Sequence, residues 1–415
     1  MKVLWIVNMV LPDAAAELGV KTSFSGSWLI DPLKCISQDK EIELATMTYG
    51  YVEKKEVVTV NNVRHYVFPG AGKRLLFTSA KTEEDCQFVL DDFQPDLIHI
   101  YGTEYSVGYS MLKLEPKIPV LLTIQGILTH IAREYHAGLP WHTYYRLFTM
   151  KQLLRLKLPL LSEWLFRINA RRERKVVSAV KYITGRTEHD REFIQQINPA
   201  VQYFCLNYNL REEFYQAKKW DPNCYVPHTI FTGAAGYPLK GLHKLIDAVA
   251  QVKEQYPDVQ LIVPGNSTDY QSSGGYERYL RRKIRKLDME SNVQFVGRRT
   301  AKEMIALLQT AHVYAFPSAY DTDSLSLCEA QLLGVPTVAS KRGGSEYLVD
   351  DQQTGLCYDF EDTEALAESI CSLFADNELC CQLSQNAIRT ASERHNREIN
   401  TAEQIALYWK LKKEV

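Results

Sequence analysis

The sequence lacks any run of about 18 uninterrupted apolar residues, the length that a membrane-spanning helix needs. It also lacks an excess of either charge: 48 basic and 50 acidic residues leave a formal net charge of −2, so no global field would attract nucleic acid. Its nine cysteines show no paired C-x-x-C spacing, which argues against a disulfide framework and against a zinc site. These absences predict a cytoplasmic protein with reduced thiols, no transmembrane helix, no metal, no cofactor and no nucleic-acid partner.

What the sequence does contain is an alternation of short apolar runs with longer helical patterns. A length of 415 residues predicts two or three domains, and 46% apolar residues is typical of a globular protein. Near-continuously apolar strands between helices indicate βαβ units, with helices on both faces of a parallel sheet. We predict an α/β protein with two Rossmann-like sheets, whose strands lie at 3–9, 42–48, 96–100, 119–124, 181–186, 229–232, 259–264, 293–296, 312–316, 335–339 and 355–358.

The alternation breaks near residues 205–228, where charged and aromatic residues mix with Pro222 without a clean period. We interpret this stretch as a linker and predict one domain over residues 1–206 and a second over residues 207–395. After residue 361 the pattern is helical to the end. The last, amphipathic helix, 396–415, is predicted to pack back on the first domain.

Ligands of open α/β sheets bind beyond the carboxyl ends of the strands, so the loops there carry the candidate site. G-A-A-G-Y-P-L-K-G, residues 233–241, follows a predicted strand and precedes a predicted helix. Its glycines would let a ligand approach the backbone, and Lys240 would offer a positive charge to a phosphate. An ordinary turn with a solvated lysine is the alternative, and it is the better explanation of this loop taken alone.

A stronger signal is P-S-A-Y-D-T-D-S-L-S-L-C-E-A-Q-L-L-G-V-P-T-V-A-S, residues 317–340. A helix is predicted from near Ser324, with Asp321 in the loop before it and Glu329 eight residues further on. Both carboxylates can therefore face a ligand at the helix N-terminus. The backbone N–H groups of residues 324–326 would meet an anion there.

These residues resemble the E-x7-E signature of retaining glycosyltransferases of family four, here as D-x7-E. The loop at 233–241, V-P-G at 263–265 and F-V-G at 295–297 look like the family's diphosphate, interior and nucleobase loops. Within the family the sequence is similar to bacterial enzymes that build capsules and surface polysaccharides, through D-x-x-x-x-S-L-C-E-A and through G-R-T-E-H-D at 185–190.

The resemblance implies the GT-B fold, in which two Rossmann-like domains face a central cleft, with the acceptor bound by residues 1–206 and the nucleotide sugar by residues 207–395. It also implies three catalytic residues. Glu329 would hold the ribose hydroxyls, Asp321 would stabilise positive character at the anomeric carbon, and Lys240 would neutralise the diphosphate. The implied donor-binding residues are Gly233, Gly236, Lys240, Gly265, Gly297, Arg298, Asp323, Ser324, Leu325, Ser326 and Glu329.

The sequence departs from the family pattern in the phosphate loop and in the signature. Ala234 and Ala235 stand where the family usually has a phosphate-binding arginine. Arg298 or Arg299 is the suggested source of that charge. Asp321 is one carbon shorter than the usual glutamate, which changes its reach toward the sugar.

The loops of the first half supply candidate acceptor-side residues. The loop before Trp28, with Gly26 and Ser27, resembles the family's glycine-bearing first loop; an ordinary turn with a core tryptophan is the alternative. Gln125 stands where many relatives have a histidine, and it can hydrogen-bond a sugar but cannot act as an acid or base. His130 and Glu104 complete the acceptor-side set, and each is also compatible with having no chemical part. His99, inside its strand, is predicted to be a satisfied core histidine.

Residues 146–175 carry nine basic and two acidic side chains, interleaved with Leu, Phe and Trp. This composition is typical of a helix in an anionic membrane interface; a core-packed helix with a solvated basic face is the alternative. The family resemblance implies polyprenyl-diphosphate-linked acceptors, which favours contact with the inner face of the cell membrane.

The resemblance implies a retaining, metal-independent glycosyltransferase that moves a sugar from a nucleotide diphosphate to a hydroxyl of a lipid-linked saccharide. No histidine pairs with a carboxylate, so the cleft would supply positioning and charge rather than a base. Two alternatives stay open: a non-catalytic partner subunit with the same fold, and a nucleotide-sugar epimerase or phosphorylase.

Overall fold

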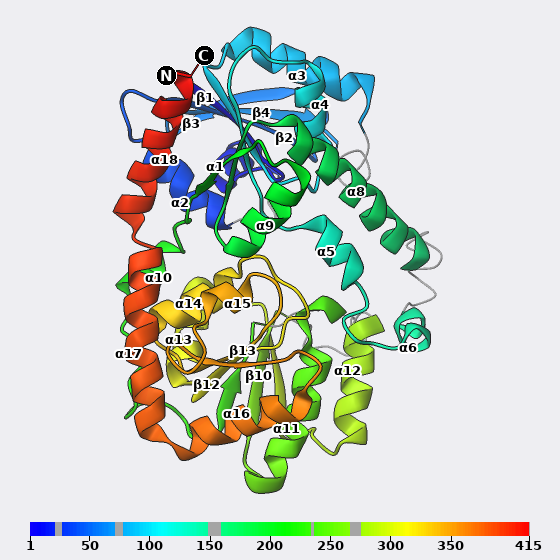
Figure 1. The fold of residues 1–415 in the computed structure, drawn as a ribbon, viewed down its shortest axis with the longest axis vertical. Coiled ribbons are helices and arrows are strands. Elements are labelled where there is room, and N and C mark those ends of the chain that lie inside the picture. Colours follow the sequence, from blue (N-terminus) through cyan, green and yellow to red (C-terminus); the bar gives the residue numbers. More distant parts are fainter. Residues whose placement is uncertain (21–26, 71–77, 148–158, 234–235, 266–274, 415) are drawn as a thin grey trace. The chain divides into compact units, whose positions relative to one another are not determined.

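The computed structural model describes residues 1–20, 27–70, 78–147, 159–233, 236–265 and 275–414. The chain divides into two compact units (Figure 1). The first comprises Met1–Thr129, Phe166–Leu210 and His395–Val415, and the second comprises His130–Leu165 and Arg211–Arg394. Each unit has its own sheet.

The first unit is built on an eight-stranded sheet in the order β3-β4-β2-β1-β5-β6-β7-β8. All neighbouring strands are parallel except β3 and β4. The strands are β1 (Lys2–Ile6), β2 (Glu43–Gly50), β3 (Glu56–Val60), β4 (Val63–Pro69), β5 (Leu97–Tyr101), β6 (Val120–Thr123), β7 (Tyr182–Gly185) and β8 (Gln202–Cys205). The helices that lie wholly or partly in this unit are α1 (Pro12–Glu17), α2 (Ser27–Ile36), α3 (Ala80–Phe93), α4 (Val107–Lys113), α5 (Leu128–Arg133), α8 (Pro159–Ala179), α9 (Glu188–Ile197) and α18 (Arg397–Lys412).

The antiparallel hairpin of β3 and β4 was not among the predicted strands. Asn61 and Asn62 form its two-residue turn, both with positive φ, of 50° and 63°. This is the conformation that asparagine tolerates in tight hairpins, so the signal was present in the sequence. β3 is an edge strand with no fully buried side chain, which weakens its apolar pattern.

The C-terminal helix α18 packs into the core of the first unit. Leu407, Tyr408 and Leu411 are buried together with Trp5 and Leu97 of the sheet. Polar contacts add to this packing: Nδ1 of His99 lies 2.6 Å from the Tyr408 hydroxyl, and Arg397 of α18 donates two hydrogen bonds to Asp31 of α2.

His99 is a core residue, as predicted. Its two ring nitrogens lie 2.6 Å from the hydroxyls of Tyr408 and Thr123, and burial lowers its pKa well below the usual value. A neutral, fully partnered imidazole inside a strand has a structural role.

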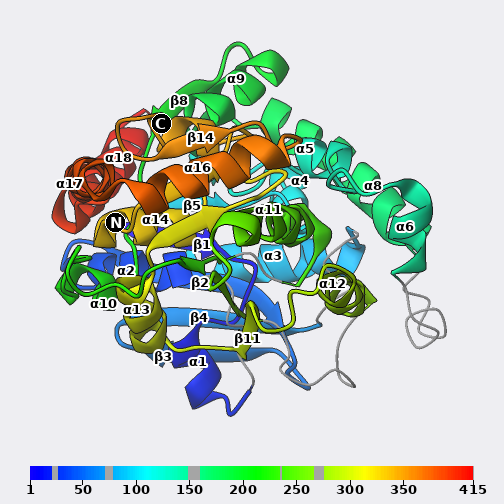
Figure 2. The ribbon, with the colours of Figure 1, turned by 90° about the horizontal axis from the view of Figure 1, so that it is seen from below.

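The second unit is built on a parallel six-stranded sheet in the order β11-β10-β9-β12-β13-β14. Its strands are β9 (Thr229–Phe231), β10 (Gln260–Pro264), β11 (Val293–Gly297), β12 (Val313–Phe316), β13 (Thr337–Ser340) and β14 (Leu356–Tyr358). Figure 2 shows α11 and α16 lying side by side over this sheet. The helices of the unit are α6 (Trp141–Arg146), α10 (Glu212–Gln216), the 3-10 helix η2 (Pro238–Lys240), α11 (Leu242–Gln255), α12 (Gly275–Lys286), α13 (Ala301–Thr310), α14 (Leu325–Leu333), α15 (Ser345–Leu348), α16 (Thr363–Ala375) and α17 (Asn377–Arg394).

Residues 130–165 belong to the second unit, although the sequence suggested that all of 1–206 would form the first. Nε2 of His243, on α11, lies 3.0 Å from the carbonyl oxygen of Ala137. A Cβ on Gly275, at the start of α12, would lie 1.2 Å from the carbonyl oxygen of Leu147. These contacts place the segment against α11 and α12. Each contact joins residues more than 100 positions apart, so a local sequence pattern cannot predict it.

In the described part of the chain, the helices are all too short or too polar to span a bilayer.

Candidate functional site

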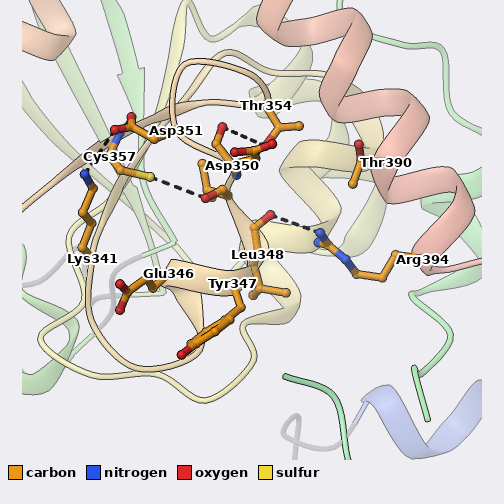
Figure 3. Close-up of a pocket in the computed structure, with 11 residues that line it drawn as sticks. Lys341, Glu346, Tyr347, Leu348, Asp350, Asp351, Thr354, Cys357, Thr390 and Arg394 are labelled. Atoms are coloured by element: carbon orange, nitrogen blue, oxygen red, sulfur yellow. Dashed lines mark hydrogen bonds and ion pairs between the residues drawn. The ribbon is translucent and has the colours of Figure 1, made fainter. Parts of the chain in front are cut away.

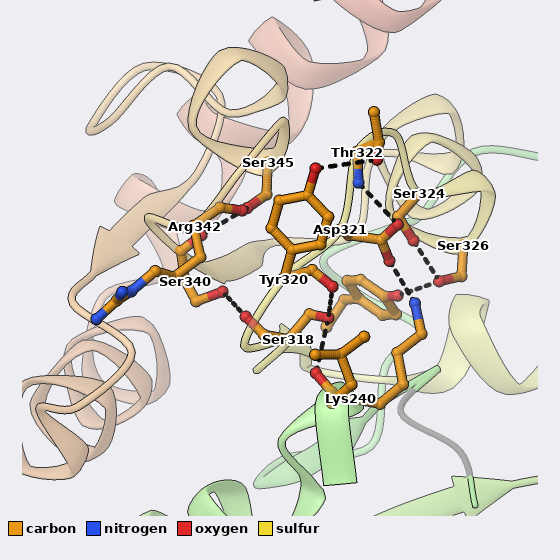
Figure 4. Close-up of polar contacts among 12 residues, drawn as sticks. Lys240, Ser318, Tyr320, Asp321, Thr322, Ser324, Ser326, Ser340, Arg342 and Ser345 are labelled. Carbon is orange, nitrogen blue, oxygen red and sulfur yellow. Dashed lines mark hydrogen bonds and ion pairs between the residues drawn. The ribbon is translucent and has the colours of Figure 1, made fainter. Parts of the chain in front are cut away.

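The loops after β9 and β12 are in direct contact in the second unit (Figure 4). Ala319 N donates to the carbonyl oxygen of Leu239 over 2.8 Å, and the Ser318 hydroxyl donates to the same oxygen over 3.2 Å. Gly241, with φ of 68°, ends η2, and a Cβ there would lie 1.6 Å from the carbonyl oxygen of Pro317. The close approach therefore requires glycine, and it places Lys240 beside the loop that carries Asp321.

Lys240 and Asp321 form an ion pair, with side chains 23% and 17% exposed. Burial opposes a charge on Lys240, but the carboxylate of Asp321 outweighs it and raises the pKa of the amine above its usual value. Two of the three predicted catalytic residues are thus in contact. An ion pair of this kind can exchange its internal contact for one with a bound anion.

Hydroxyl groups gather where α14 begins. The Tyr314 hydroxyl donates to Ser326 Oγ over 2.9 Å, and Ser324 Oγ lies 3.1 Å from the same atom. Gly233 faces them, since a Cβ there would lie 2.8 Å from Ser326 Oγ. Gly233 and residues 324–326, all predicted to bind the donor, are therefore neighbours at a helix N-terminus, which favours anions.

Gly343 and Gly344 support the Asp321 loop from the other side. Gly344 N donates to the carbonyl oxygen of Asp321 over 2.8 Å, and a Cβ on Gly344 would lie 1.5 Å from the carbonyl oxygen of Thr322. The G-G turn after β13 thus fixes the backbone of the loop that holds Asp321.

Glu329, the third predicted catalytic residue, is bound by a residue that the sequence did not single out. Arg211 donates from Nε and from one terminal nitrogen to the two Glu329 carboxylate oxygens, both over 2.6 Å. The Glu329 side chain is 3% exposed. Burial raises the pKa of Glu329, and the hydrogen bonds and charge of Arg211 oppose that rise. Burial opposes the charge on Arg211, but its hydrogen bonds and ion pairing with Glu329 raise its pKa. In this structure each carboxylate oxygen of Glu329 therefore accepts a hydrogen bond from Arg211.

The remaining predicted donor residues lie after neighbouring strands of the same sheet. Gly265 N donates to the carbonyl oxygen of Gly297 over 2.7 Å, so the ends of β10 and β11 are joined. Arg298 is exposed, and Arg299 donates to Glu303 of α13 over 3.1 Å. Gly236 is exposed before η2, and the carboxylate of Asp323 accepts a hydrogen bond from the Cys328 thiol over 3.6 Å.

The predicted acceptor-side residues fall in different places. His130 belongs to the second unit and packs edge-on against Tyr320, with ring centroids 5.6 Å apart, so it is next to the Asp321 loop. Glu104 and Gln125 lie in the first unit, beyond the ends of β5 and β6. Gly26 is outside the described residues, and Ser27 is the first residue of α2.

Residues 146–175 are described only in part, with 148–158 outside the described ranges. Arg172, one of the nine basic residues of this segment, is 8% exposed and donates to the backbone of Glu104, so it is not part of an exposed basic face. Arg167, Arg171, Arg174 and Lys175 of α8 are exposed, and Trp164 is 55% exposed.

A separate hollow of about 420 Å³ lies around α15 and the following loop (Figure 3). It is lined by Lys341, Glu346, Tyr347, Leu348, Val349, Asp350, Asp351, Thr354, Cys357, Thr390 and Arg394. Lys341 and Asp351 pair across 3.1 Å, and Arg394 donates to the carbonyl oxygen of Leu348. It contains none of the predicted site residues.

The Lys240–Asp321 pair, the start of α14 and the G-G turn all lie in one stretch of sequence. Residues 227–390 match the family of glycosyl transferases, group 1. The match includes Lys240, Asp321 and Glu329, whereas Arg211 precedes it.

The chain is also similar in sequence to known glycosyltransferases. It is 33% identical over 171 residues to a D-inositol 3-phosphate glycosyltransferase of Corynebacterium urealyticum, covering 40% of this chain and 39% of that relative. The aligned region thus spans about two fifths of the relative's length.

Two solved structures match the chain along its length. The sucrose-phosphate synthase from Thermosynechococcus elongatus has a TM-score of 0.77 at 17% identity and covers 100% of both chains. Anabaena Alr3699/HepE in complex with UDP and glucose has a TM-score of 0.69 at 18% identity and covers 99% of both chains. The likeness confirms the predicted fold class, GT-B with two parallel-sheet Rossmann-like units.

Proposed function

We propose that this protein is a retaining glycosyltransferase that takes a sugar from a nucleotide diphosphate donor and transfers it to an acceptor hydroxyl. The observation that carries the proposal is the Lys240–Asp321 pair beside the start of α14, within the group 1 match. A diphosphate fits a lysine and a helix N-terminus because both present positive charge. A carboxylate next to them fits a sugar, through its hydroxyls and through the positive character of the anomeric carbon in the transition state.

The mechanism that we propose uses positioning and charge. Lys240 and the N–H groups at residues 324–326 would hold the diphosphate and stabilise it as it leaves. Asp321 would exchange its contact with Lys240 for one with the transferred sugar. The departing phosphate oxygen would accept the proton of the attacking hydroxyl on the same face, which retains the anomeric configuration, and no metal takes part.

The donor proposal is tested by thermal shift with UDP-, GDP- and ADP-sugars. A ligand that binds only the folded protein stabilises it by about 2.7 kcal/mol at 100 times its Kd, so one nucleotide class is expected to raise Tm by several degrees. The free sugars are the control and are expected to give a smaller shift. A protein that binds no nucleotide sugar, with or without membranes, would instead fit the non-catalytic partner subunit.

We also propose that the acceptor is a lipid-linked saccharide of a surface or capsular polysaccharide, reached at the inner face of the cell membrane. Trp164, Arg167, Arg171 and residues 174–175 are exposed and recur at three- and four-residue spacing, so they share one face of α8. Basic residues beside an exposed tryptophan suit an anionic lipid surface.

Vesicle flotation tests the membrane contact. Charge reversal of Arg171, Arg174 and Lys175 to glutamate is expected to weaken binding to anionic vesicles at least tenfold, since each basic residue near such a surface is worth about 1 kcal/mol. The matched control reverses Arg282, Arg285 and Lys286, which are exposed on α12. Equal vesicle binding by the two variants would show that the basic face of α8 is not the membrane contact.

A further inference from the structure

Two polar atoms at the ends of β5 and β6 are buried without a hydrogen-bond partner among the described residues: Glu104 Oε2 and Gln125 Nε2. The strands are neighbours, with Tyr101 paired to Thr123, and Gly102 N donates to the carbonyl oxygen of Thr123 over 2.9 Å. A buried polar group without a hydrogen-bond partner destabilises the folded state, so two such groups on neighbouring strand ends need an explanation.

Gly102 lies next to both of these side chains. Its φ is 84°, and a Cβ there would lie 2.0 Å from Glu104 Oε2 and 3.1 Å from Gln125 Oε1. The carboxyl and carboxamide groups therefore pack against the same glycine and leave no room for a side chain at position 102. Together these three residues define the Glu104–Gln125 niche.

Helix α8 holds the loops around the niche in place. Arg172 donates to the carbonyl oxygen of Glu104 over 2.7 Å. Glu173, fully buried beside it, accepts from Thr103 Oγ1 at 3.0 Å and from Leu128 N at 2.8 Å. The loop after β5 and the chain after β6 are thus anchored to adjacent residues of one helix, so the unpaired atoms belong to a rigid arrangement.

The two unpaired atoms differ in what they need. A carboxylate oxygen only accepts hydrogen bonds, and an amide nitrogen only donates them. A hydroxyl group does both, because its proton can go to one partner while its oxygen lone pair receives the other. We propose that the Glu104–Gln125 niche binds a hydroxyl of the acceptor saccharide or polyol, with Glu104 Oε2 accepting from it and Gln125 Nε2 donating to it. This assignment rests on the proposed function, because it takes the acceptor to be a hydroxyl compound.

The charge on Glu104 gives the proposal a pH signature. Burial raises the pKa of Glu104 to about 7. Backbone hydrogen bonds from Glu104 and Thr103 and the charge of Arg172 oppose the rise, whereas Glu173 adds to it, and Tyr105 lies on the same loop. Above this pH the carboxylate can accept from a hydroxyl. Below this pH the carboxyl is protonated, so its O–H donates a hydrogen bond where the carboxylate oxygen accepted one. Binding of the acceptor saccharide is therefore expected to weaken as pH falls through about 7.

The test compares wild type with Glu104→Gln and Gln125→Leu, both close in size to the residues they replace. Each is expected to raise the acceptor KM at least tenfold at pH 8, with donor binding unchanged. Glu104→Gln is also expected to lose the pH dependence of acceptor KM between pH 6 and 8. Glu53→Gln, at an exposed position, is the control and is expected to match wild type.

A second measurement does not depend on turnover. Saturation-transfer NMR with methyl α-glucoside, methyl α-mannoside and inositol is expected to show contact with wild type that Glu104→Gln loses. If none of these probes contacts wild type, or if both variants keep a wild-type acceptor KM, the niche holds only water and the proposal fails. If the sugars bind wild type but no nucleotide sugar does, the niche stands and the transferase proposal fails.

Discussion

Replacing Lys240 with alanine is expected to lower the rate of sugar transfer by about 10²- to 10³-fold, the loss typical of removing one preorganised charge or donor at a developing oxyanion. The lysine is 23% exposed and already fixed against Asp321, so little ordering is needed before it meets a diphosphate. The effect should fall on kcat/KM for the donor, measured with whichever nucleotide sugar raises Tm.

The matched control is Lys244→Ala. Lys244 lies four residues away on α11 and pairs with the exposed carboxylate of Glu361 over 2.6 Å. It should keep the wild-type rate within about twofold, because its partner Glu361 is 55% exposed and neither residue is among the predicted site residues. Asp321→Asn should lose rate to a similar extent as Lys240→Ala, and the double variant should lose little more, since the two residues act as a unit. A Lys240→Ala protein with near wild-type turnover would contradict the proposed role.

Removing Glu329 is expected to destabilise the second unit by about 3–5 kcal/mol, because it leaves the partly buried guanidinium of Arg211 without its partner. Glu329→Leu should show this loss in urea unfolding. The double variant Arg211→Leu/Glu329→Leu should recover most of it, because replacing a whole buried ion pair with apolar side chains is often neutral.

Glu290→Leu is the control for this experiment. It breaks a pair with Arg285 in which the side chains are 72% and 58% exposed, so it should cost less than about 1 kcal/mol. Equal costs for Glu290→Leu and Glu329→Leu would show that the buried pair is not energetically special. The result also bears on donor binding, because a Glu329 variant that no longer binds nucleotide has lost a structural ion pair as well as a candidate ribose contact.

Most of the fold follows from local pattern, because buried parallel strands are apolar along their whole length. All eleven predicted strands are present, with ends shifted by a few residues at most. Three strands were missed. Two of them are edge strands: β3 has alternate residues exposed, and β8 has no fully buried residue. The third, β4, is largely buried, but Arg64 and His65 interrupt its apolar run.

The site residues could be predicted where they belong to a sequence motif, and could not be predicted where they lie outside one. Lys240, Asp321 and the start of α14 follow strand ends, and the structure brings them together. Arg211 is 118 positions from Glu329 and sits in a stretch without periodicity, so no spacing rule connects the two. The role of Arg172 as a loop anchor was hidden for the same reason, since a buried and a solvated arginine look alike in a basic run.

The packing of α18 has a consequence for the order in which the protein is made. Leu407, Tyr408 and Leu411 belong to the same core as Trp5 and Leu97. As the chain leaves the ribosome, the first unit cannot close its core until these late residues have emerged. The second unit, whose last residue is Arg394, is complete in sequence before that point. Domains generally fold as units during synthesis, so here the unit that starts first is expected to finish last, and its nascent sheet must wait through the translation of the whole second unit.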